Sequence, residues 1–201
     1  DFEIIDLKMS NQFPEKCKIA DVREAETLRH NITGDVVVNL AAVHRDDIRD
    51  KIEYQHTNVD GAENVALVCE EKGIDWFGVD GDFTVIPKNN SLIHDFSEGT
   101  PSINRTFDCA WSVEFLEHVD EEYVDNFMKA FQLADKMVIA TAAPPGTPGH
   151  HHVNCQPLEY WIDVFDNYGF EYSPEVTEKI KSISSMAKPF IKRHGFVMFK
   201  K

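Results

Sequence analysis

Segments typical of β-strands alternate with segments typical of α-helices along most of this chain of 201 residues. The strand candidates are short runs rich in valine, isoleucine and phenylalanine, whereas the helix candidates repeat apolar residues at intervals of three and four. This alternation predicts an α/β fold, with an open, mostly parallel sheet and helices on both of its faces. The expected strands are residues 2–7, 18–22, 35–42, 76–80, 91–96, 107–112, 136–141 and 195–200, and the expected helices are residues 24–30, 59–72, 121–134 and 157–168.

Charge and cysteine content narrow the classes of partner and compartment. The formal net charge is −15 and the pI is about 4.9. Nucleic acids and anionic membranes favour basic surfaces, so we expect neither as a partner and expect a small-molecule substrate instead. The four cysteines lack CxxC spacing and no secretory leader is visible, which predicts reduced thiols and a cytoplasmic protein. Because the chain begins at Asp1 rather than at Met, we expect it to be a fragment.

Two acidic residues stand at the ends of neighbouring strand candidates. Asp80 ends the run at residues 76–80, and Asp95 stands near the end of the run at residues 91–96. Ligands of open parallel sheets bind beyond the carboxyl ends of the strands. A carboxylate in that position can accept hydrogen bonds from ribose hydroxyls, as we expect for Asp80, or from an adenine amino group, as we expect for Asp95. The structural alternatives are a turn-forming aspartate before glycine and a helix N-cap.

The most specific pattern is FDCAWSVEFLEHV at residues 107–119. It resembles a segment of class I S-adenosylmethionine (SAM)-dependent methyltransferases that can be written roughly as FDxxxSxxxLEHV. The order of Asp80, Asp95 and this segment is also the order of that family. The resemblance covers residues 75–201, and it includes the later GHHHVN sequence at residues 149–154, which is similar to the substrate side of a methyltransferase subfamily.

The resemblance implies a Rossmann-like fold that transfers a methyl group from SAM to an unidentified small-molecule acceptor, for which a sugar-related molecule is one candidate. In-line displacement of this kind depends mainly on positioning, and a general base is needed only where the acceptor must lose a proton. For His118, the structural alternative to a role as general base is a side chain packed at the start of a helix. By position, Asp80 would bind the ribose and Asp95 the adenine, Ser112 and Glu114 would line the methionine end of SAM, and the candidate bases are His118, His151 and His152.

Three consecutive histidines at residues 150–152 and the nearby Cys155 raise the question of a metal site. Adjacent histidine side chains point in different directions, and zinc sites usually show defined gaps such as HxxxH or CxxC. We therefore expect no metal site and interpret the segment as a polar substrate loop.

Residues 1–74 carry a different pattern. KIADVR at residues 18–23 and NVDGAENV at residues 58–65 resemble the interior of an extended short-chain dehydrogenase/reductase, the family of NAD-dependent nucleotide-sugar epimerases and dehydratases. The resemblance implies NAD as the cofactor, with Asp6 at its ribose and Asp21 at its adenine. The GxxGxxG loop of that family would lie before residue 1, and its YxxxK pair is absent from the chain.

The two patterns meet near residue 74. We expect the strand at residues 35–42 and the helix at residues 59–72 to replace the first strand and helix of a methyltransferase, so that one composite sheet forms. The loop at residues 43–50 contains no glycine, and glycine lets a backbone approach a cofactor closely, so we expect weak or absent SAM binding. Three interpretations remain: a methyltransferase that is active or impaired, an NAD-dependent epimerase or dehydratase fragment, and a non-catalytic fusion or truncated product.

Overall fold

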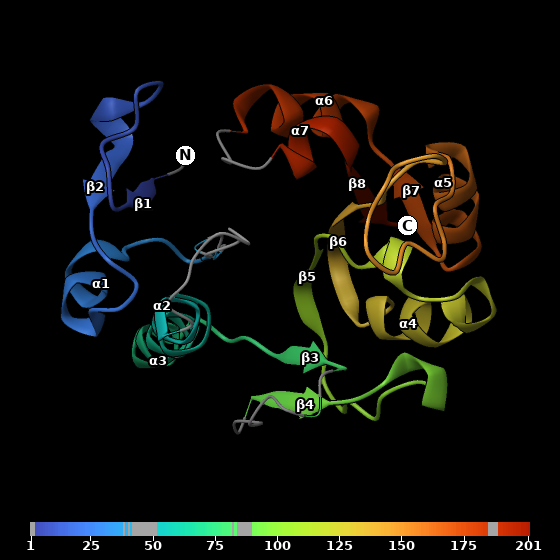
Figure 1. Ribbon diagram of the computed structural model, residues 1–201, viewed down its shortest axis with the longest axis horizontal. Coiled ribbons are helices and arrows are strands. Elements are labelled where there is room, and N and C mark those ends of the chain that lie inside the picture. Colours follow the sequence, from blue (N-terminus) through green and yellow to red (C-terminus); the bar gives the residue numbers. More distant parts are fainter. Residues whose placement is uncertain are drawn as a thin grey trace. The chain divides into compact units, whose positions relative to one another are not determined.

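The computed structural model describes residues 3–37, 39, 41, 52–81, 83, 90–184 and 189–201. The chain divides into two compact units, Asp1–Phe77 and Gly78–Lys201, whose helices and strands are labelled in Figure 1. Each unit has its own hydrophobic core. The predicted α/β class is confirmed. The predicted division at residues 74 and 75 concerns sequence resemblance, and it stays a prediction. No helix in the described part of the chain has the length and apolar character that a bilayer span requires.

The described residues of the first unit form one pair of parallel strands and a helical core. Ile4 of the first strand lies opposite Cys17 of the second. Leu28 and Val68, from two different helices, are its most buried apolar residues, at 2% and 0% exposed. A π-helical turn at Gln55–Asp60 leads into the last helix. The elements are β1 (Ile4–Asp6), β2 (Cys17–Ile19), α1 (Ala25–Asn31), α2 (Ile52–Tyr54) and α3 (Gly61–Glu71).

The strand predicted at residues 35–42 is wrong at every residue of that run that the structure describes. Val36 is 74% exposed, and the side chain of Asn39 accepts a hydrogen bond from the backbone N–H of Ala41 at 3.1 Å. A local bond of this kind competes with the hydrogen bonds of a sheet. A β-branched run forms a strand only where a partner and a buried face are available. The predicted loop at residues 43–50 lies outside the described residues.

The second unit holds two sheets. One is a parallel pair, β3 with β4, and the other has four strands in the order β5-β6-β8-β7. The elements are β3 (Gly78–Asp80), β4 (Ser91–Ile93), β5 (Phe107–Ser112), α4 (Val124–Phe131), β6 (Ala134–Thr141), α5 (Leu158–Asn167), β7 (Phe170–Tyr172), α6 (Pro174–Ile183), α7 (Phe190–His194) and β8 (Gly195–Lys200).

The expected single composite sheet is not confirmed, because the strands among the described residues form three separate sheets. Within the largest sheet, β5 and β6 are parallel, and Ser112 lies opposite Ala140. In contrast, β8 runs antiparallel to both of its neighbours, β6 and β7. Apolar patterning marks a strand and its buried face, but it does not encode the direction in which the strand pairs.

An aromatic cluster joins several segments of the second unit. The buried ring of Phe127 on α4 has four aromatic neighbours, with centroid distances of 5.4–6.3 Å. Edge-to-face packing of such rings adds to the stabilisation that burial provides. The cluster therefore fixes the segments that follow β4 and β5 against α4 and α5. The four neighbours of Phe127 are Phe96, Phe115, Phe131 and Trp161.

Gly195 begins β8 at a point where the backbone of α7 comes very close. A Cβ atom at this position would lie 2.5 Å from the carbonyl oxygen of Ile191, although the φ of −68° is one that alanine accepts. We expect Gly195→Ala to lower the free energy of unfolding by about 1–3 kcal/mol through overpacking, as measured by urea denaturation. Gly81→Ala is the control, since its Cβ would come no closer than 3.8 Å to the carbonyl of His94. Equal stability of the two variants would contradict the close contact.

Candidate functional site

Asp80 and Asp95 leave the same end of the β3–β4 pair. Asp80 lies opposite Ile93 in the parallel register, and Asp95 follows two residues later. The backbone N–H of His94 donates to the carbonyl of Asp80 at 2.8 Å, which continues the pairing beyond the last strand residue. Both aspartates are exposed. Their proposed contacts with ribose and adenine stay predictions.

Asp95 also acts as a helix N-cap, which was the structural alternative that its sequence position allowed. Its carboxylate accepts a hydrogen bond from the backbone N–H of Ser97 at 2.8 Å and caps the short 3-10 helix Phe96–Glu98. The same hydrogen bond holds the pKa of the Asp95 carboxyl below its usual value. Asp95 is therefore ionised and fixed in orientation without any ligand.

The turns that follow β4 and β5 pack against each other. Phe96 comes directly after Asp95, and Phe115 comes directly after Glu114. The two rings meet edge to face with their centroids 5.5 Å apart. The side chain of Asn126 on α4 also donates to the carbonyl of Phe96 at 2.7 Å. These contacts hold the segment of Asp95 next to the segment of Glu114.

Ser112 and Glu114 lie at the end of β5 and in the turn after it. Ser112 is buried, and its hydroxyl has no hydrogen-bond partner among the described residues. Glu114 adopts a φ of +54°, in the left-handed region that non-glycine residues rarely occupy. Its backbone N–H donates to the hydroxyl of Thr141 at 2.8 Å, and Thr141 ends the neighbouring strand β6. A backbone held in such a conformation by a neighbouring strand is typical of functional sites.

Glu117 is the most unusual buried group of this unit. Its side chain is 0% exposed, and neither carboxylate oxygen has a hydrogen-bond partner in the described part of the chain. Its carbonyl accepts from the backbone N–H groups of Val153 and Asn154 at 2.9 and 3.1 Å. Burial and, next, the charge of Glu117 raise the pKa of the Glu114 carboxyl. The two glutamates therefore lie within electrostatic reach of each other.

The structure brings together two of the three candidate bases. The rings of His118 and His152 have centroids 5.0 Å apart and planes at 78°. Nδ1 of His118 is 3.0 Å from the carbonyl oxygen of His151, and Nδ1 of His152 is 3.1 Å from the carbonyl oxygen of Thr147. His151 is exposed and has a φ of +54°. It therefore contributes its carbonyl to this group, whereas its ring faces solvent.

A cavity of about 180 Å³ in the same unit carries basic side chains. Burial and the neighbouring Arg193 lower the pKa of the His194 imidazole, while the charge of Glu117 acts in the opposite direction. The carboxylate of Glu117 therefore lies close enough to His194 to affect the ionisation of its imidazole. The cavity can accept a small group of negative charge. Its lining includes Lys181, Arg193, His194, Gln156, Pro144 and Phe196.

In the first unit, Asp6 ends β1, and Asp21 stands two residues after the end of β2. Asp6 accepts from the backbone N–H of Lys8 at 3.1 Å. Asp21 accepts from Nε of Arg23 at 2.9 Å, and this contact lowers the pKa of the Asp21 carboxyl. Asp21 is thus engaged by a cation of its own chain. The proposed contacts of both residues with NAD stay predictions.

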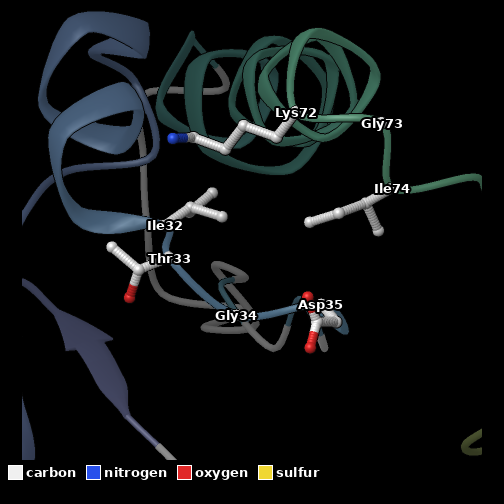
Figure 2. A pocket seen from close by; sticks show the side chains of 7 residues that line it. All are labelled: Ile32, Thr33, Gly34, Asp35, Lys72, Gly73 and Ile74. Carbon is white, nitrogen blue, oxygen red and sulfur yellow. The ribbon is translucent and has the colours of Figure 1, made fainter.

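A second cavity, of about 250 Å³, lies at the other end of these strands (Figure 2). It is lined by residues that follow the ends of α1 and α3, including Thr33 and Lys72. Thr33 contacts Glu3, which precedes β1, so the cavity is near the amino end of the strand. Helix C-termini carry partial negative charge and do not favour phosphates. This cavity is therefore not the nucleotide site that Asp6 and Asp21 predicted.

Sequence reasoning missed three residues of the second unit: Glu117, Thr141 and Asn154. Asn154 is 2% exposed, and its side-chain nitrogen and oxygen both lack hydrogen-bond partners among the residues described. The signal for Glu117 was available, because an acid inside the apolar sequence Phe115–Val119 must either be paired or perform a function. Thr141 and Asn154 had no comparable signal.

No family model matches the chain. Among curated proteins, it is 40% identical over 77 residues to N-acetyl-alpha-D-glucosaminyl-diphospho-ditrans,octacis-undecaprenol 4-epimerase of Escherichia coli O157:H7. The match covers 37% of this chain and 23% of that enzyme. The matched stretch thus spans less than a quarter of the relative's length.

Solved structures with some similarity include proteins that bind SAM or its product SAH. Magnesium protoporphyrin IX methyltransferase from Synechocystis PCC 6803 with bound SAH has 13% identity and a TM-score of 0.37, over 69% of this chain and 61% of that one. LepI in complex with SAM has 10% identity and a TM-score of 0.40, over 67% and 39%. The pyocyanin biosynthetic protein PhzM has 10% identity and a TM-score of 0.40, over 71% and 47%. Likeness at this level does not decide the activity of the chain.

Proposed function

We propose that the second unit belongs to a SAM-dependent methyltransferase. The observation that carries the proposal is the packing of Phe96 against Phe115, which holds the turn after β4 beside the turn after β5. Acidic and hydroxyl side chains at the carboxyl ends of neighbouring strands are the groups that bind a nucleoside cofactor in open α/β sheets. The FDCAWSVEFLEHV sequence occupies the second of these turns.

In the proposed reaction, Asp80 and Asp95 hold the adenosine, and Ser112 and Glu114 line the methionine end. A nucleophilic atom of the acceptor attacks the methyl carbon of SAM. The bond between that carbon and the sulfonium sulfur breaks, its electron pair stays on sulfur, and SAH leaves. If the nucleophile is a hydroxyl, its proton passes to a base, for which His118 and His152 are the candidates.

The methyl acceptor fits the basic cavity best if it carries negative charge. Lys181 and Arg193 line this cavity, and His194 connects it electrostatically to Glu117. A sugar-related acceptor with an acidic group is one candidate of suitable chemistry. The expectation of weak or absent SAM binding rests on the loop at residues 43–50, which lies outside the described residues, and the proposal commits to SAM binding that is weak but measurable.

Calorimetric titration with SAM and SAH tests the proposed function. We expect both to bind, and we expect Asp80→Asn to weaken binding by about tenfold or more, since a hydrogen bond to a charged group contributes about 1.5–3 kcal/mol. Asp163→Asn on the exposed surface of α5 is the matched control and should bind like the wild type. Absence of SAM and SAH binding, or equal binding by Asp80→Asn, would overturn the assignment.

An epimerase-related function is the second candidate, and the 40% identity over 77 residues favours it. In that case the first unit would bind NAD through Asp6 and Asp21. None of the similar solved structures described above supports NAD. A titration with NAD under the same conditions separates the two candidates, because tight NAD binding without SAM binding would favour the epimerase.

A further inference from the structure

Three side chains of the second unit present possible metal ligands to one another. One carboxylate oxygen of Glu117 and one ring nitrogen each of His118 and His152 all lie within 4.8 Å of each other. Glu117 and His118 are neighbours in the turn after β5, whereas His152 comes from the loop after β6. Ligands around one cation have separations of this order, because each bond to the ion is about 2.0–2.2 Å long.

The buried carboxylate supplies an independent argument. Glu117 is fully buried without a hydrogen-bond partner in the described residues. An isolated carboxylate in such surroundings is strongly unfavourable, and buried charges in proteins are therefore paired or bind a metal. Glu114, three positions earlier in the same turn, adds a second carboxylate, whose pKa is raised by burial and next by the charge of Glu117. A cation at this position would neutralise both.

The two imidazole rings are oriented by hydrogen bonds of the kind that metal-binding histidines usually make to backbone carbonyls. A carbonyl oxygen only accepts hydrogen bonds, so Nδ1 of His118 donates to His151 and Nδ1 of His152 donates to Thr147. In a neutral ring this leaves the lone pair on Nε2. Histidine ligands typically donate their other ring N–H to a backbone carbonyl, which fixes the tautomer and the orientation of the ring.

Gly149 makes room for the ring of His152. A Cβ atom at position 149 would lie 2.1 Å from Nε2 of His152, so no larger residue allows this ring position. The thiol of Cys155 lies 3.6 Å from Nδ1, the nitrogen that is engaged with Thr147. Cys155 is therefore outside the group of three residues whose ligand atoms all lie within 4.8 Å of one another.

We propose that Glu117, His118 and His152 together bind one divalent cation. Two imidazoles and one carboxylate suit Zn²⁺, Co²⁺ or Mn²⁺ better than Ca²⁺ or Mg²⁺, which prefer oxygen ligands alone. Three protein ligands leave coordination positions open for water or substrate. If the proposed function also holds, His118 and His152 act as ligands rather than as bases. The acceptor is then a hydroxyl compound whose oxygen would bind the cation, and its proton would pass to solvent water.

The test uses the purified full chain, treated with EDTA and then dialysed. Titration with CoCl₂ is followed by visible absorption and by calorimetry. We expect one Co²⁺ per chain, and we expect Glu117→Gln, His118→Ala and His152→Ala each to weaken binding by about tenfold or more. His150→Ala is the matched control, because this exposed neighbour is outside the group. Gly149→Ala should also weaken binding, although it removes no ligand.

Stability measurements keep the result interpretable if a variant folds poorly. Co²⁺ should raise the denaturation midpoint of the wild type and of His150→Ala, and should not raise that of Glu117→Gln. Without metal, Glu117→Gln should be no less stable than the wild type, because it removes a buried charge and keeps the volume. A purely structural glutamate would give the reverse result.

The proposal is overturned if the wild type binds no Co²⁺, Zn²⁺ or Mn²⁺, or if the three ligand variants bind like His150→Ala. A titration with SAM on the same samples separates this outcome from the proposed function. Metal binding without SAM binding would sink the methyltransferase assignment and leave the metal site in place. SAM binding without metal binding would overturn the metal site and leave the methyltransferase assignment in place.

Discussion

Phe127→Ala should lower the free energy of unfolding of the second unit by about 3–5 kcal/mol. Phe127 is fully buried and lies at the centre of the aromatic cluster, with one ring from its own helix and rings from three other segments around it. Removing it leaves a cavity that rigid aromatic neighbours cannot collapse to fill. The edge-to-face contacts are lost as well, at about 0.5–1.5 kcal/mol for each pair.

Urea denaturation followed by tryptophan fluorescence measures this effect. Trp161 packs against Phe127 at 6.3 Å and reports on the same cluster. Phe83→Ala makes the same chemical change at a side chain that is 88% exposed, and it should alter stability by less than about 0.5 kcal/mol. Phe127→Leu should fall between the two. Equal effects at positions 127 and 83 would show that the cluster is not the core of this unit.

Leu28→Ala should destabilise the first unit by about 2–5 kcal/mol. Leu28 is 2% exposed, and its core includes Ile32 of the same segment and Val65 and Val68 of α3. This core is small, so the loss of one leucine removes a large share of its buried apolar surface. We expect the variant to open α1 and α3 together, because each helix buries its apolar face against the other.

Hydrogen exchange of backbone amides checks this prediction residue by residue. Amides of α1 and α3 should lose protection in Leu28→Ala. Leu67→Ala is the control, because Leu67 lies on α3 and is 44% exposed. It should leave the exchange of α1 unchanged. Protection of α1 that survives in Leu28→Ala would mean that another contact holds this helix.

Local patterns predicted most of the elements but not their assembly. The strand at residues 107–112 and the strand at residues 195–200 have the predicted bounds. The described residues of the run 35–42 form no strand, because a high β-strand propensity does not ensure that a partner strand is available. The antiparallel β8 was not predicted, since strand direction depends on chain connections that a local pattern does not encode.

In the candidate site, too, single residues could be predicted from the sequence, whereas contacts between distant residues could not. Asp80 and Asp95 could be found because Asp80 ends β3 and Asp95 stands two residues after the end of β4, so their position relative to the strand ends is local information. The meeting of Glu117 with His152 was out of reach, because 35 positions separate them. The expectation of no metal site, which stays untested and which the proposed cation site would overturn, rested on short spacing rules, and such rules see only ligands that one turn or one helix supplies. Ligands contributed by the turns of two neighbouring strands escape them.

The double hydrogen bond to the carbonyl of Glu117 has a practical consequence for engineering. Val153 and Asn154 are fastened to the turn after β5 by main-chain atoms alone. The segment before Val153 begins at the end of β6, which the sheet holds in place. Both ends of this segment are therefore held by backbone hydrogen bonds. Residues inserted at Pro145–Gly146 would extend outward, and doubling the length of such a loop costs only about 0.6 kcal/mol. This stretch is therefore a place where foreign loops can be grafted, and under the proposed function such loops would be used to change the choice of methyl acceptor.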